Sequence, residues 1–138
     1  MSWLIDTDVF SHPAKQQKDP RVVAWLRQEH SASYTSTVVV AQLAYWVRTK
    51  RGRQKEALQQ WLGDLVHAME GRIYGFSVSI ACVWADLRHQ LSRIGKPMPI
   101  EDSYIAATAL RHNLTIVTGN ERDFERPGIK VFNPFKEL

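Results

Sequence analysis

The sequence contains only one cysteine, Cys82, among its 138 residues. A single thiol cannot form an internal disulfide, which excludes a disulfide-stapled scaffold and favours a reducing compartment. Because Cys82 lies within the apolar run IACVW, we expect a buried small side chain rather than a nucleophile. No apolar stretch approaches the roughly 20 residues that a membrane span needs, and the start MSWLIDTD lacks a signal-peptide pattern. These features predict a cytoplasmic protein without a membrane partner.

Motifs for several cofactor classes are also missing. The seven glycines form no phosphate-binding loop, and the Cys and His residues lack the spacing of a zinc site. The five histidines show no pairing, so none is predicted to be catalytic. Positive charge is only mildly in excess: the formal net charge is +4, and the pI is about 9.4. Such a surface favours phosphate backbones but does not by itself establish nucleic-acid binding.

The composition that is present belongs to a folded globular protein, with 44% hydrophobic and 23% charged residues. The length suits one domain, so we expect residues 1–138 to form a single domain. Short apolar segments alternate with amphipathic ones, which predicts an α/β fold with a parallel sheet and helices on both faces. The predicted strands cover residues 2–5, 33–36, 72–76, 114–117 and 129–132, and the predicted helices cover 21–30, 38–51, 54–69, 78–94, 101–112 and a turn at 122–125.

Polar side chains occur where such a sheet binds its ligands, beyond the carboxyl ends of the strands. Asp6 follows the first predicted strand, and Asp102 lies in the first turn of a later helix. Carboxylates that converge repel one another unless a cation lies between them, and Mg²⁺ prefers oxygen ligands while keeping several waters. The pattern therefore predicts a metal site. The further candidates for this site are Gln42, Thr118, Asn120 and Asp123, with Asp8 beside Asp6.

Each of these residues also has an ordinary structural explanation. Asp6 and Asp8 can form a turn at a strand end, and Asp102 can stabilise the positive end of a helix dipole. Asp123 is more typical of a helix start than of a metal ligand, and Thr118 can shape a turn. Taken one at a time, the residues leave both explanations open.

The order of the motifs favours the functional explanation. The segments IDTDVFS, STVVVAQL, IEDSYIAATA and IVTGNERDF, followed by the ending VFNPF, resemble the PIN-domain family along essentially the whole chain. Within that family the chain resembles the VapC-type toxins of bacterial toxin–antitoxin pairs, especially their FitB-like branch. The resemblance implies a five-stranded parallel sheet flanked by helices, a homodimer, and Mg²⁺- or Mn²⁺-dependent endoribonuclease activity on structured RNA. It also implies a cognate VapB-type antitoxin as a partner.

The resemblance also implies roles for individual residues. Asp6, in the DTD motif, and Asp102, in IEDSYIAATA, match the aspartates that bind metal in the family. Asn120 matches a position at which relatives carry Asp or Asn, Thr118 matches a hydroxyl close to the metal, and Asp123 is a nearby acid. The expected catalytic group is Asp6, Gln42, Asp102 and Asn120, with Asp6 and Asp102 on the metal and Asp8, Thr118 and Asp123 in support.

One position departs from the family pattern. The family has Glu in the stretch V-A-E-L, whereas this chain has Gln42 in the stretch VAQL. Glutamine cannot act as a base, although its carbonyl oxygen can still face a cation. Losing a unit charge a few ångströms away weakens cation binding by about 4 kcal/mol before screening, at an effective dielectric constant of about 20. The change is either engineered or a natural variant, and the alternative function is a weak or inactive PIN domain that binds antitoxin or RNA without cutting.

A dense basic run surrounds Gly52. We expect this run to contact the RNA backbone, although a solvated helix end explains the same pattern because helix C-termini favour positive charge. A third possible function, a phosphoacceptor signalling domain, is disfavoured because Asp6 lies too near the N-terminus for an acidic pair to precede it. The predicted RNA-binding residues are Arg48, Lys50, Arg51 and Arg53.

Overall fold

Five short strands form one parallel sheet in the order β3-β2-β1-β4-β5. The computed structural model describes residues 1–138. Each strand lies within a segment that the sequence predicted, so the predicted parallel α/β sheet is confirmed. The strands are β1 (Trp3–Ile5), β2 (Ser33–Ser36), β3 (Ile73–Tyr74), β4 (Thr115–Val117) and β5 (Val131–Phe132).

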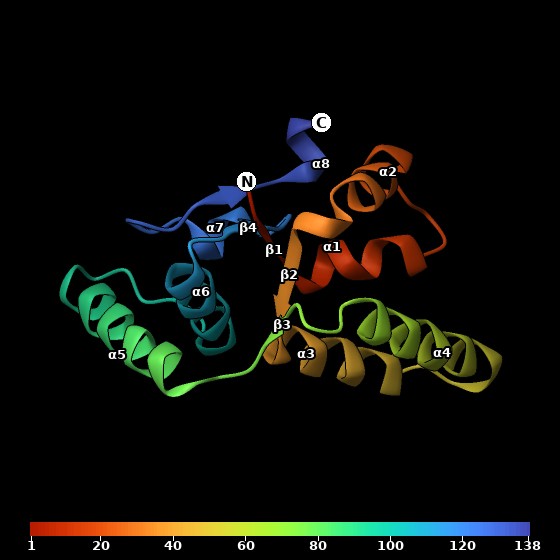
Figure 1. The fold of residues 1–138 in the computed structure, drawn as a ribbon, viewed down its shortest axis with the longest axis horizontal. Helices are drawn as coiled ribbons and strands as arrows, with labels where there is room; N and C mark the ends of the chain where they lie inside the picture. Colours follow the sequence, from red (N-terminus) through yellow and green to blue (C-terminus); the bar gives the residue numbers. More distant parts are fainter.

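Helices connect the strands and cover both faces of the sheet. They are α1 (Thr7–Ser11), α2 (Pro20–Gln28), α3 (Thr37–Arg48), α4 (Gly52–Ala68), α5 (Val78–Arg93), α6 (Ile100–His112), α7 (Glu121–Phe124) and α8 (Pro134–Glu137). In Figure 1, α5 and α6 lie to the left of β1 and β2, whereas α1 and α2 lie to the right. No helix is both long and apolar enough to cross a membrane.

Local capping signals explain where two of the longer helices begin. The Ser36 hydroxyl accepts a hydrogen bond from the amide of Val39 at 3.3 Å, so the three valines that follow start α3 rather than a strand. Ser77 caps α5 in the same way, through the amide of Ile80 at 3.2 Å. The sequence did not predict α1 and α8, because helices of five and four residues are too short to show a helical period.

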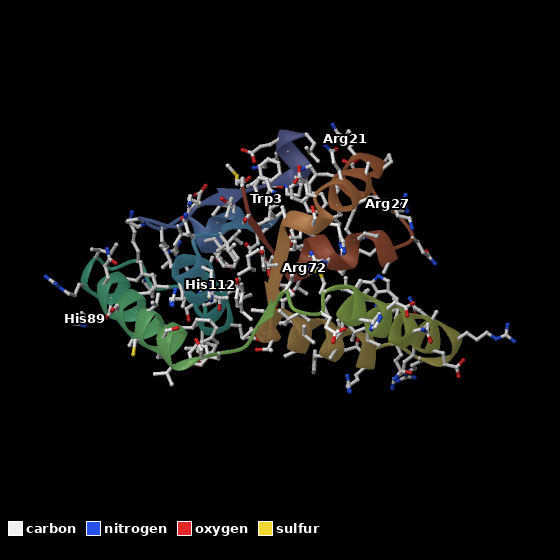
Figure 2. All side chains as sticks on the ribbon, viewed as in Figure 1. Trp3, Arg21, Arg27, Arg72, His89 and His112 are labelled. Carbon is white, nitrogen blue, oxygen red and sulfur yellow. The ribbon has the colours of Figure 1, made fainter.

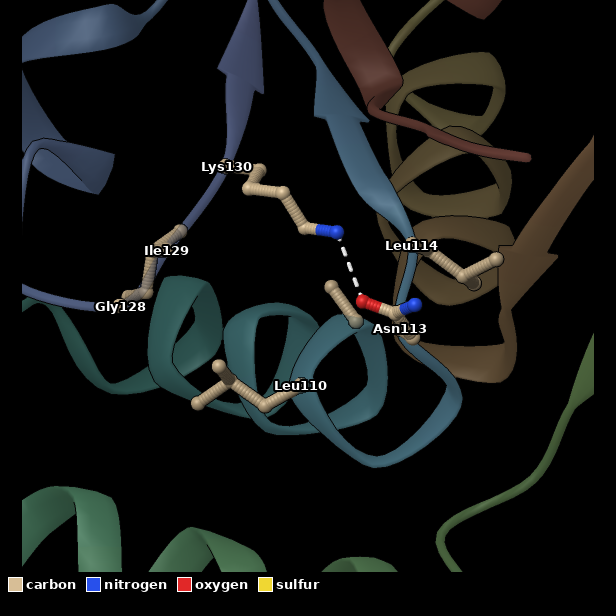
Figure 3. Close-up of a pocket in the computed structure, with 7 residues that line it drawn as sticks. Leu110, Asn113, Leu114, Gly128, Ile129 and Lys130 are labelled. Carbon is tan, nitrogen blue, oxygen red and sulfur yellow. Dashed lines mark hydrogen bonds between the residues drawn. The ribbon is translucent and has the colours of Figure 1, made fainter. Parts of the chain in front are cut away.

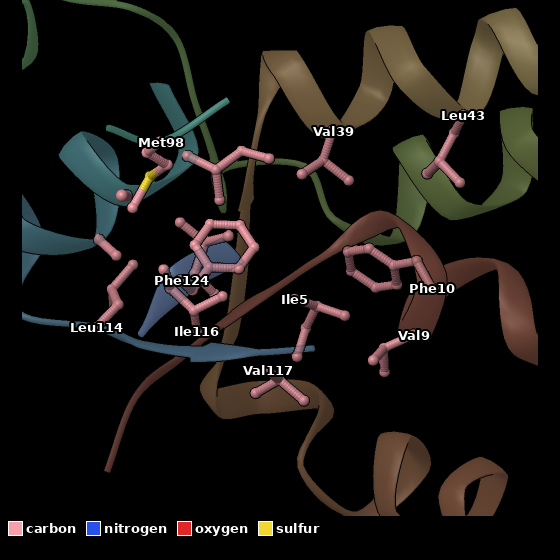
Figure 4. Close-up of a cluster of buried hydrophobic side chains, with 14 of the residues drawn as sticks. Ile5, Val9, Phe10, Val39, Leu43, Met98, Leu114, Ile116, Val117 and Phe124 are labelled. Atoms are coloured by element: carbon pink, nitrogen blue, oxygen red, sulfur yellow. The ribbon is translucent and has the colours of Figure 1, made fainter. Parts of the chain in front are cut away.

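The central strands β1 and β4 are buried from both sides by these helices. Leu4, Ile5, Ile116 and Val117 are all fully buried, and the register pairs Leu4 with Ile116 and Ile5 with Val117. Figure 4 shows Ile5, Ile116 and Val117 within a cluster of apolar side chains that also come from α1 and α3. Burying a side chain of this size contributes about 1.5–3 kcal/mol. The core therefore fixes the register of β1 and β4, and with it the residues that follow them.

Arg72 ties the edge of the sheet to α4. Its guanidinium donates to the carbonyl of Ser33 at 2.8 Å and to the carbonyl of Ala68 at 2.9 Å (Figure 2). Because the Arg72 guanidinium donates hydrogen bonds to backbone carbonyls, we assign this arginine a structural role rather than a role in binding nucleic acid.

The prediction that Cys82 is buried was wrong. Cys82 is exposed on α5, and the helix instead buries Ile80, Leu87 and Leu91. Two residues along a helix correspond to a turn of about 200°, so a side chain two positions after Ile80 points away from the core. The apolar run IACVW led to the wrong prediction because a helix buries the side chains of one face and not those of a continuous segment.

Candidate active site

Asp6 lies at the carboxyl end of β1, directly beside the residue that ends β4. Its amide donates to the carbonyl of Val117 at 3.0 Å, which continues the β1–β4 register. Its carboxylate caps α1 by accepting from the amide of Thr7 at 2.8 Å. The hydroxyl of Thr118, which is fully buried, donates to the other carboxylate oxygen of Asp6 at 2.9 Å. The structure thus brings together two of the predicted site residues, Asp6 and Thr118.

Asp8 holds the turn that follows β4. Its Oδ2 accepts from the amide of Gly119 at 2.8 Å, and its Oδ1 lies 3.4 Å from the Thr118 hydroxyl. A Cβ on Gly119 would come within 2.8 Å of Asp8 Oδ2, so this approach requires glycine. Asn120 continues the turn, and its amide donates to the Thr118 hydroxyl at 2.9 Å. Asp8 acts on the site through this turn, which fits the supporting role that we predicted for it.

Asp102 meets the site from α6. It lies in the first turn of that helix, where the charges of Asp6 and Asp123 add to the effect of burial in raising the pKa of its carboxyl group. The side-chain amide of Asn120 donates to Asp123 Oδ2 at 3.0 Å. Asn120 therefore fixes an acid whose charge acts on Asp102. Carboxylates that converge in this way repel one another unless a proton or a cation lies between them.

Gln42 approaches from α3. Its carbonyl oxygen accepts a hydrogen bond from the hydroxyl of Thr7, the residue after Asp6. The side chain is half-buried, so it lies at the edge of the acidic group rather than in solvent. Sequence reasoning had not singled out Thr7, although this residue stands inside the DTD motif.

The site holds carboxylates together with little compensation from positive side chains, because only Lys15 acts on one of them, Asp8. Burial raises the pKa of Asp6 to about 6, with repulsion from Asp8 adding to the effect, while hydrogen bonds from Thr7 and Thr118 oppose it. Burial also raises the pKa of Asp102 to about 7, with further contributions from Asp6 and Asp123. The pKa of Asp8 is raised by burial, against the lowering effect of the Gly119 amide. Near neutral pH this group binds protons that a cation would displace.

The donor set suits a hard divalent cation. Every polar side-chain group at the site presents oxygen, with no thiol or imidazole among them, and this is the ligand type that Mg²⁺ and Mn²⁺ prefer. The structure does not assemble three or more His, Cys, Asp or Glu side chains into a complete metal cage. Positions 42 and 120 carry amides where carboxylates would complete one. The residues present fit a cation that keeps part of its water shell.

The predicted RNA-binding residues lie apart from this acidic group. Arg48 ends α3, about 9 Å along the helix axis from Gln42. Lys50, Arg51 and Arg53 follow in the turn into α4, where the Lys50 ammonium lies 5.4 Å from the centre of the Trp46 ring. Figure 1 shows this turn at the far end of α3 from β1. The basic surface therefore lies at the C-terminal end of α3, whereas Gln42 faces the acidic site from the middle of the same helix.

A small enclosed cavity of the molecule does not belong to the site. A cavity of about 40 Å³ lies where α6 ends and β4 begins, and Lys130 Nζ donates there to Asn113 Oδ1 at 2.7 Å (Figure 3). This is the amino end of β4, whereas Thr118 follows its carboxyl end. The acidic group lies at the opposite end of that strand, with Asp6 and Thr118 buried and Asn120 exposed.

Comparison with known proteins places this arrangement in a family. The family model described as PIN domain matches residues 3–130. The chain belongs to the PIN-domain family. This PIN domain is 35% identical over 137 residues to Toxin FitB of Neisseria gonorrhoeae, which covers 97% of this chain and 99% of that protein.

Two further similarities extend over nearly the whole PIN domain. VapC ribonuclease Y4jK of Sinorhizobium fredii is 32% identical over 136 residues, covering 96% of this chain and 97% of that protein. The crystal structure of FitAcB from Neisseria gonorrhoeae superposes with a TM-score of 0.90 at 35% identity, covering 96% of this chain and 98% of that chain. The resemblance found in the sequence motifs is therefore confirmed at the level of the family and of the fold.

Proposed function

We propose that this PIN domain is a metal-dependent endoribonuclease and the toxin component of a type II toxin–antitoxin pair. The observation that carries the proposal is the meeting of Asp6, Thr118, Asp102 and Asp123 from separate segments at one end of the sheet. Relatives named as a VapC ribonuclease and as Toxin FitB support the same activity and role. The single cysteine is consistent with a cytoplasmic location.

We propose Asp6 and Asp102 as the direct ligands of Mg²⁺ or Mn²⁺. When bound, such an ion would neutralise charge that develops on the phosphodiester and make a nearby water more acidic. The Thr118 hydroxyl orients Asp6, because it donates to one carboxylate oxygen while the Thr7 amide binds the other. Asn120 fixes Asp123, whose charge acts on Asp102. Gln42 is neutral at every pH, so it can contribute a carbonyl oxygen but cannot accept the proton of an attacking water.

The RNA substrate would reach the acidic group across the basic end of α3. Arg48, Arg51 and Arg53 are exposed and lie where a long nucleic acid could contact both ends of that helix. Phosphate contacts of this kind position a substrate without selecting its sequence. The carboxylates of the acidic group repel phosphate until a cation is present, so we expect RNA binding at the site to depend on metal.

A groove between α1, α2 and α4 suits the expected antitoxin partner. It has a volume of about 380 Å³ and a largely apolar lining that includes Phe10, Leu26, Trp61 and Leu65, with Arg27 at its border (Figure 2). Apolar grooves of this kind take the apolar face of an amphipathic helix. The solved relatives include FitAB, whose structure was determined with an IR36 DNA fragment. We propose that a VapB-type antitoxin binds this PIN domain in the same general way.

The expected homodimer remains a prediction. Large apolar side chains are exposed along α5, α6 and the segment before α5, and they are the surface where we would look for a second copy. Sedimentation of the free chain tests the oligomeric state directly. These exposed residues are Phe76, Val78, Ile94, Ile100 and Leu110.

The nuclease proposal is tested by comparing Asp102→Asn with Glu101→Gln. Both variants remove one acidic group from the first turn of α6, but Glu101 is exposed whereas Asp102 is half-buried. With Mn²⁺ and a structured RNA, we expect Asp102→Asn to reduce cleavage to background and Glu101→Gln to retain it. Equal loss in both variants would contradict the assignment of Asp102. If neither the present chain nor Gln42→Glu cuts RNA, the chain is a binding module without nuclease activity.

A further inference from the structure

The ending VFNPF of the sequence has no part in the proposed chemistry, yet the structure places it against the active site. Residues 133–138, which we call the C-terminal clamp, follow β5 and form α8. In Figure 1, α8 lies above β1 and next to α2, with the chain end at its tip. The clamp therefore reaches the end of the sheet at which Asp6 and Thr118 meet.

Phe135 of the clamp touches the turn that follows β4. Two of its ring carbons, Cδ2 and Cε2, lie 3.0 and 3.1 Å from the point where a Cβ on Gly119 would stand. Asp8 Oδ2 lies 2.8 Å from the same point and accepts the Gly119 amide hydrogen at 2.8 Å. Gly119 is thus packed closely against both a carboxylate from α1 and an aromatic ring from α8. Its neighbours in the chain are the site residues Thr118 and Asn120.

The clamp is built to keep Phe135 in place. Asn133 is buried, with 3% of its surface exposed, and its side-chain oxygen accepts from the amide of Phe135 at 2.9 Å. The Glu137 carboxylate accepts in return from the amide of Asn133 at 2.9 Å, which completes a reciprocal cap. Pro134 is buried at the first helical position, where its fixed φ angle favours the helix. A four-residue helix would not be stable alone, so these contacts serve to fix its position.

Contacts with neighbouring helices fix the far side of the clamp. Arg21, on α2, donates to the carbonyl of Leu138 at 2.9 Å, and Figure 2 shows Arg21 beside α8. The His12 ring packs edge-on against Phe135, with ring centres 5.0 Å apart. Arg21 therefore holds the end of the clamp through Leu138, and His12 packs against the Phe135 ring. The same ring packs on Gly119.

We propose that Phe135 is a positioning residue for the acidic site, acting through Gly119. Its ring keeps the Gly119 amide on Asp8, and this keeps the Thr118 hydroxyl on Asp6 Oδ2. Without the ring, the turn loses a packing contact that limits its movement, and the Thr118 donor that orients Asp6 is no longer fixed. The expected consequence is weaker cation binding and slower chemistry, with RNA binding little affected when Mn²⁺ is saturating. The Mn²⁺-affinity and cleavage readouts of this inference rest on the proposed function, whereas the exchange rate of the Gly119 amide does not.

The test compares Phe135→Ala, Phe135→Tyr and Phe132→Ala in the full chain. Tyrosine keeps both ring carbons that touch Gly119. Phe132 is a half-buried phenylalanine of the same segment, but its ring packs on Trp3 and Trp25, with ring centres 5.3 and 5.4 Å away. It therefore controls for the loss of stability that follows removal of an aromatic ring. Three quantities are measured: the exchange rate of the Gly119 amide hydrogen without metal, the Kd for Mn²⁺ by calorimetry, and kcat and KM for RNA cleavage.

For Phe135→Ala we expect faster exchange of the Gly119 amide and a Kd for Mn²⁺ raised by about tenfold, as for other residues that orient a metal ligand. We expect kcat to fall while KM stays the same, because the loss affects the reaction rather than RNA binding. Phe135→Tyr and Phe132→Ala should keep the wild-type exchange rate and Kd. The proposal is overturned if Phe135→Ala leaves both quantities unchanged, if Phe132→Ala changes them equally, or if Phe135→Tyr fails to restore them. Should the unmodified chain bind no Mn²⁺ and cut no RNA, the nuclease proposal fails, and the Gly119 exchange rate still decides the role of Phe135.

Discussion

Replacing Gln42 by Glu tests the electrostatic account of the site, because the change adds one charge with almost no change in shape. The carbonyl oxygen of Gln42 accepts from the Thr7 hydroxyl, and a carboxylate at the same position would accept the same hydrogen bond more strongly. The side chain is therefore expected to stay in place. Its new charge would lie beside Asp6, whose pKa is already raised to about 6 by burial and by Asp8.

The expected gain in cation affinity follows from the distance and the exposure of position 42. A unit charge a few ångströms from a cation contributes about 4 kcal/mol at an effective dielectric constant of about 20. Gln42 is only half-buried, so water screens the interaction and a net gain of about 1–2 kcal/mol is realistic. This corresponds to a Kd for Mg²⁺ or Mn²⁺ lowered by about tenfold.

Calorimetric titration of both cations into each protein near pH 7.5 measures this change. Gln59→Glu is the matched control, because it adds the same charge by the same substitution at an exposed position on α4. We expect Gln42→Glu to bind both cations more tightly and to cut RNA faster, while Gln59→Glu behaves as the unmodified chain. Equal affinities for all three proteins would refute a metal-facing role of position 42. An equal gain in both variants would show that net charge alone is responsible.

Three further predictions address pH, the Gly119 turn and the basic run. The folded-state pKa of Asp6, about 6, lies above its ordinary value of 3.8, so its contribution to stability is fully present below pH 3.8 and is lost as pH rises through 6. Without metal, we expect urea unfolding to show about 3 kcal/mol less stability from this residue at pH 8 than at pH 4, and Asp6→Asn to remove that difference; a flat pH profile would contradict the burial of Asp6. Gly119→Ala should cost about 1–3 kcal/mol, because a Cβ there meets Asp8 and Phe135. Gly63→Ala has open space within α4 and should be neutral or stabilising by thermal unfolding; similar losses in both would argue against the close approach. Replacing Arg51 and Arg53 together by Ala should reduce the slope of log affinity for RNA against log salt by about 1–2, and an unchanged slope would remove both residues from the RNA contact surface.

The strands and the longer helices could be predicted because their signals are local. The apolar segment that ends at Asp6 and the Ser36 cap before three valines each determine an element from a few neighbouring residues. Asp6 and Thr118 could be predicted as neighbours because parallel strands end at one edge of the sheet. These predictions needed only the spacing of apolar residues in the sequence and the rule that ligands bind beyond the carboxyl ends of parallel strands.

Other features depend on distances that no local pattern contains. The effect of Asp123 on Asp102 acts between α7 and α6, and the role of Asp8 depends on how closely Gly119 approaches it. Phe135 touches Gly119 only because β5 and α8 carry it back across the sheet. The exposure of Cys82 was missed because an apolar run does not state which side of its helix faces the core. In each case the side chain acquires its role from tertiary packing.

The central claim is that Asp6 and Asp102, which are far apart in the sequence, bind one cation together. Anomalous diffraction from crystals grown with Mn²⁺ tests it most directly, because the ion itself is located. We predict a single strong peak, or a close pair of peaks, in contact with carboxylate oxygens of both Asp6 and Asp102. A peak at another position, or carboxylates more than about 10 Å apart, too far for one ion or a close ion pair to bridge, would contradict it.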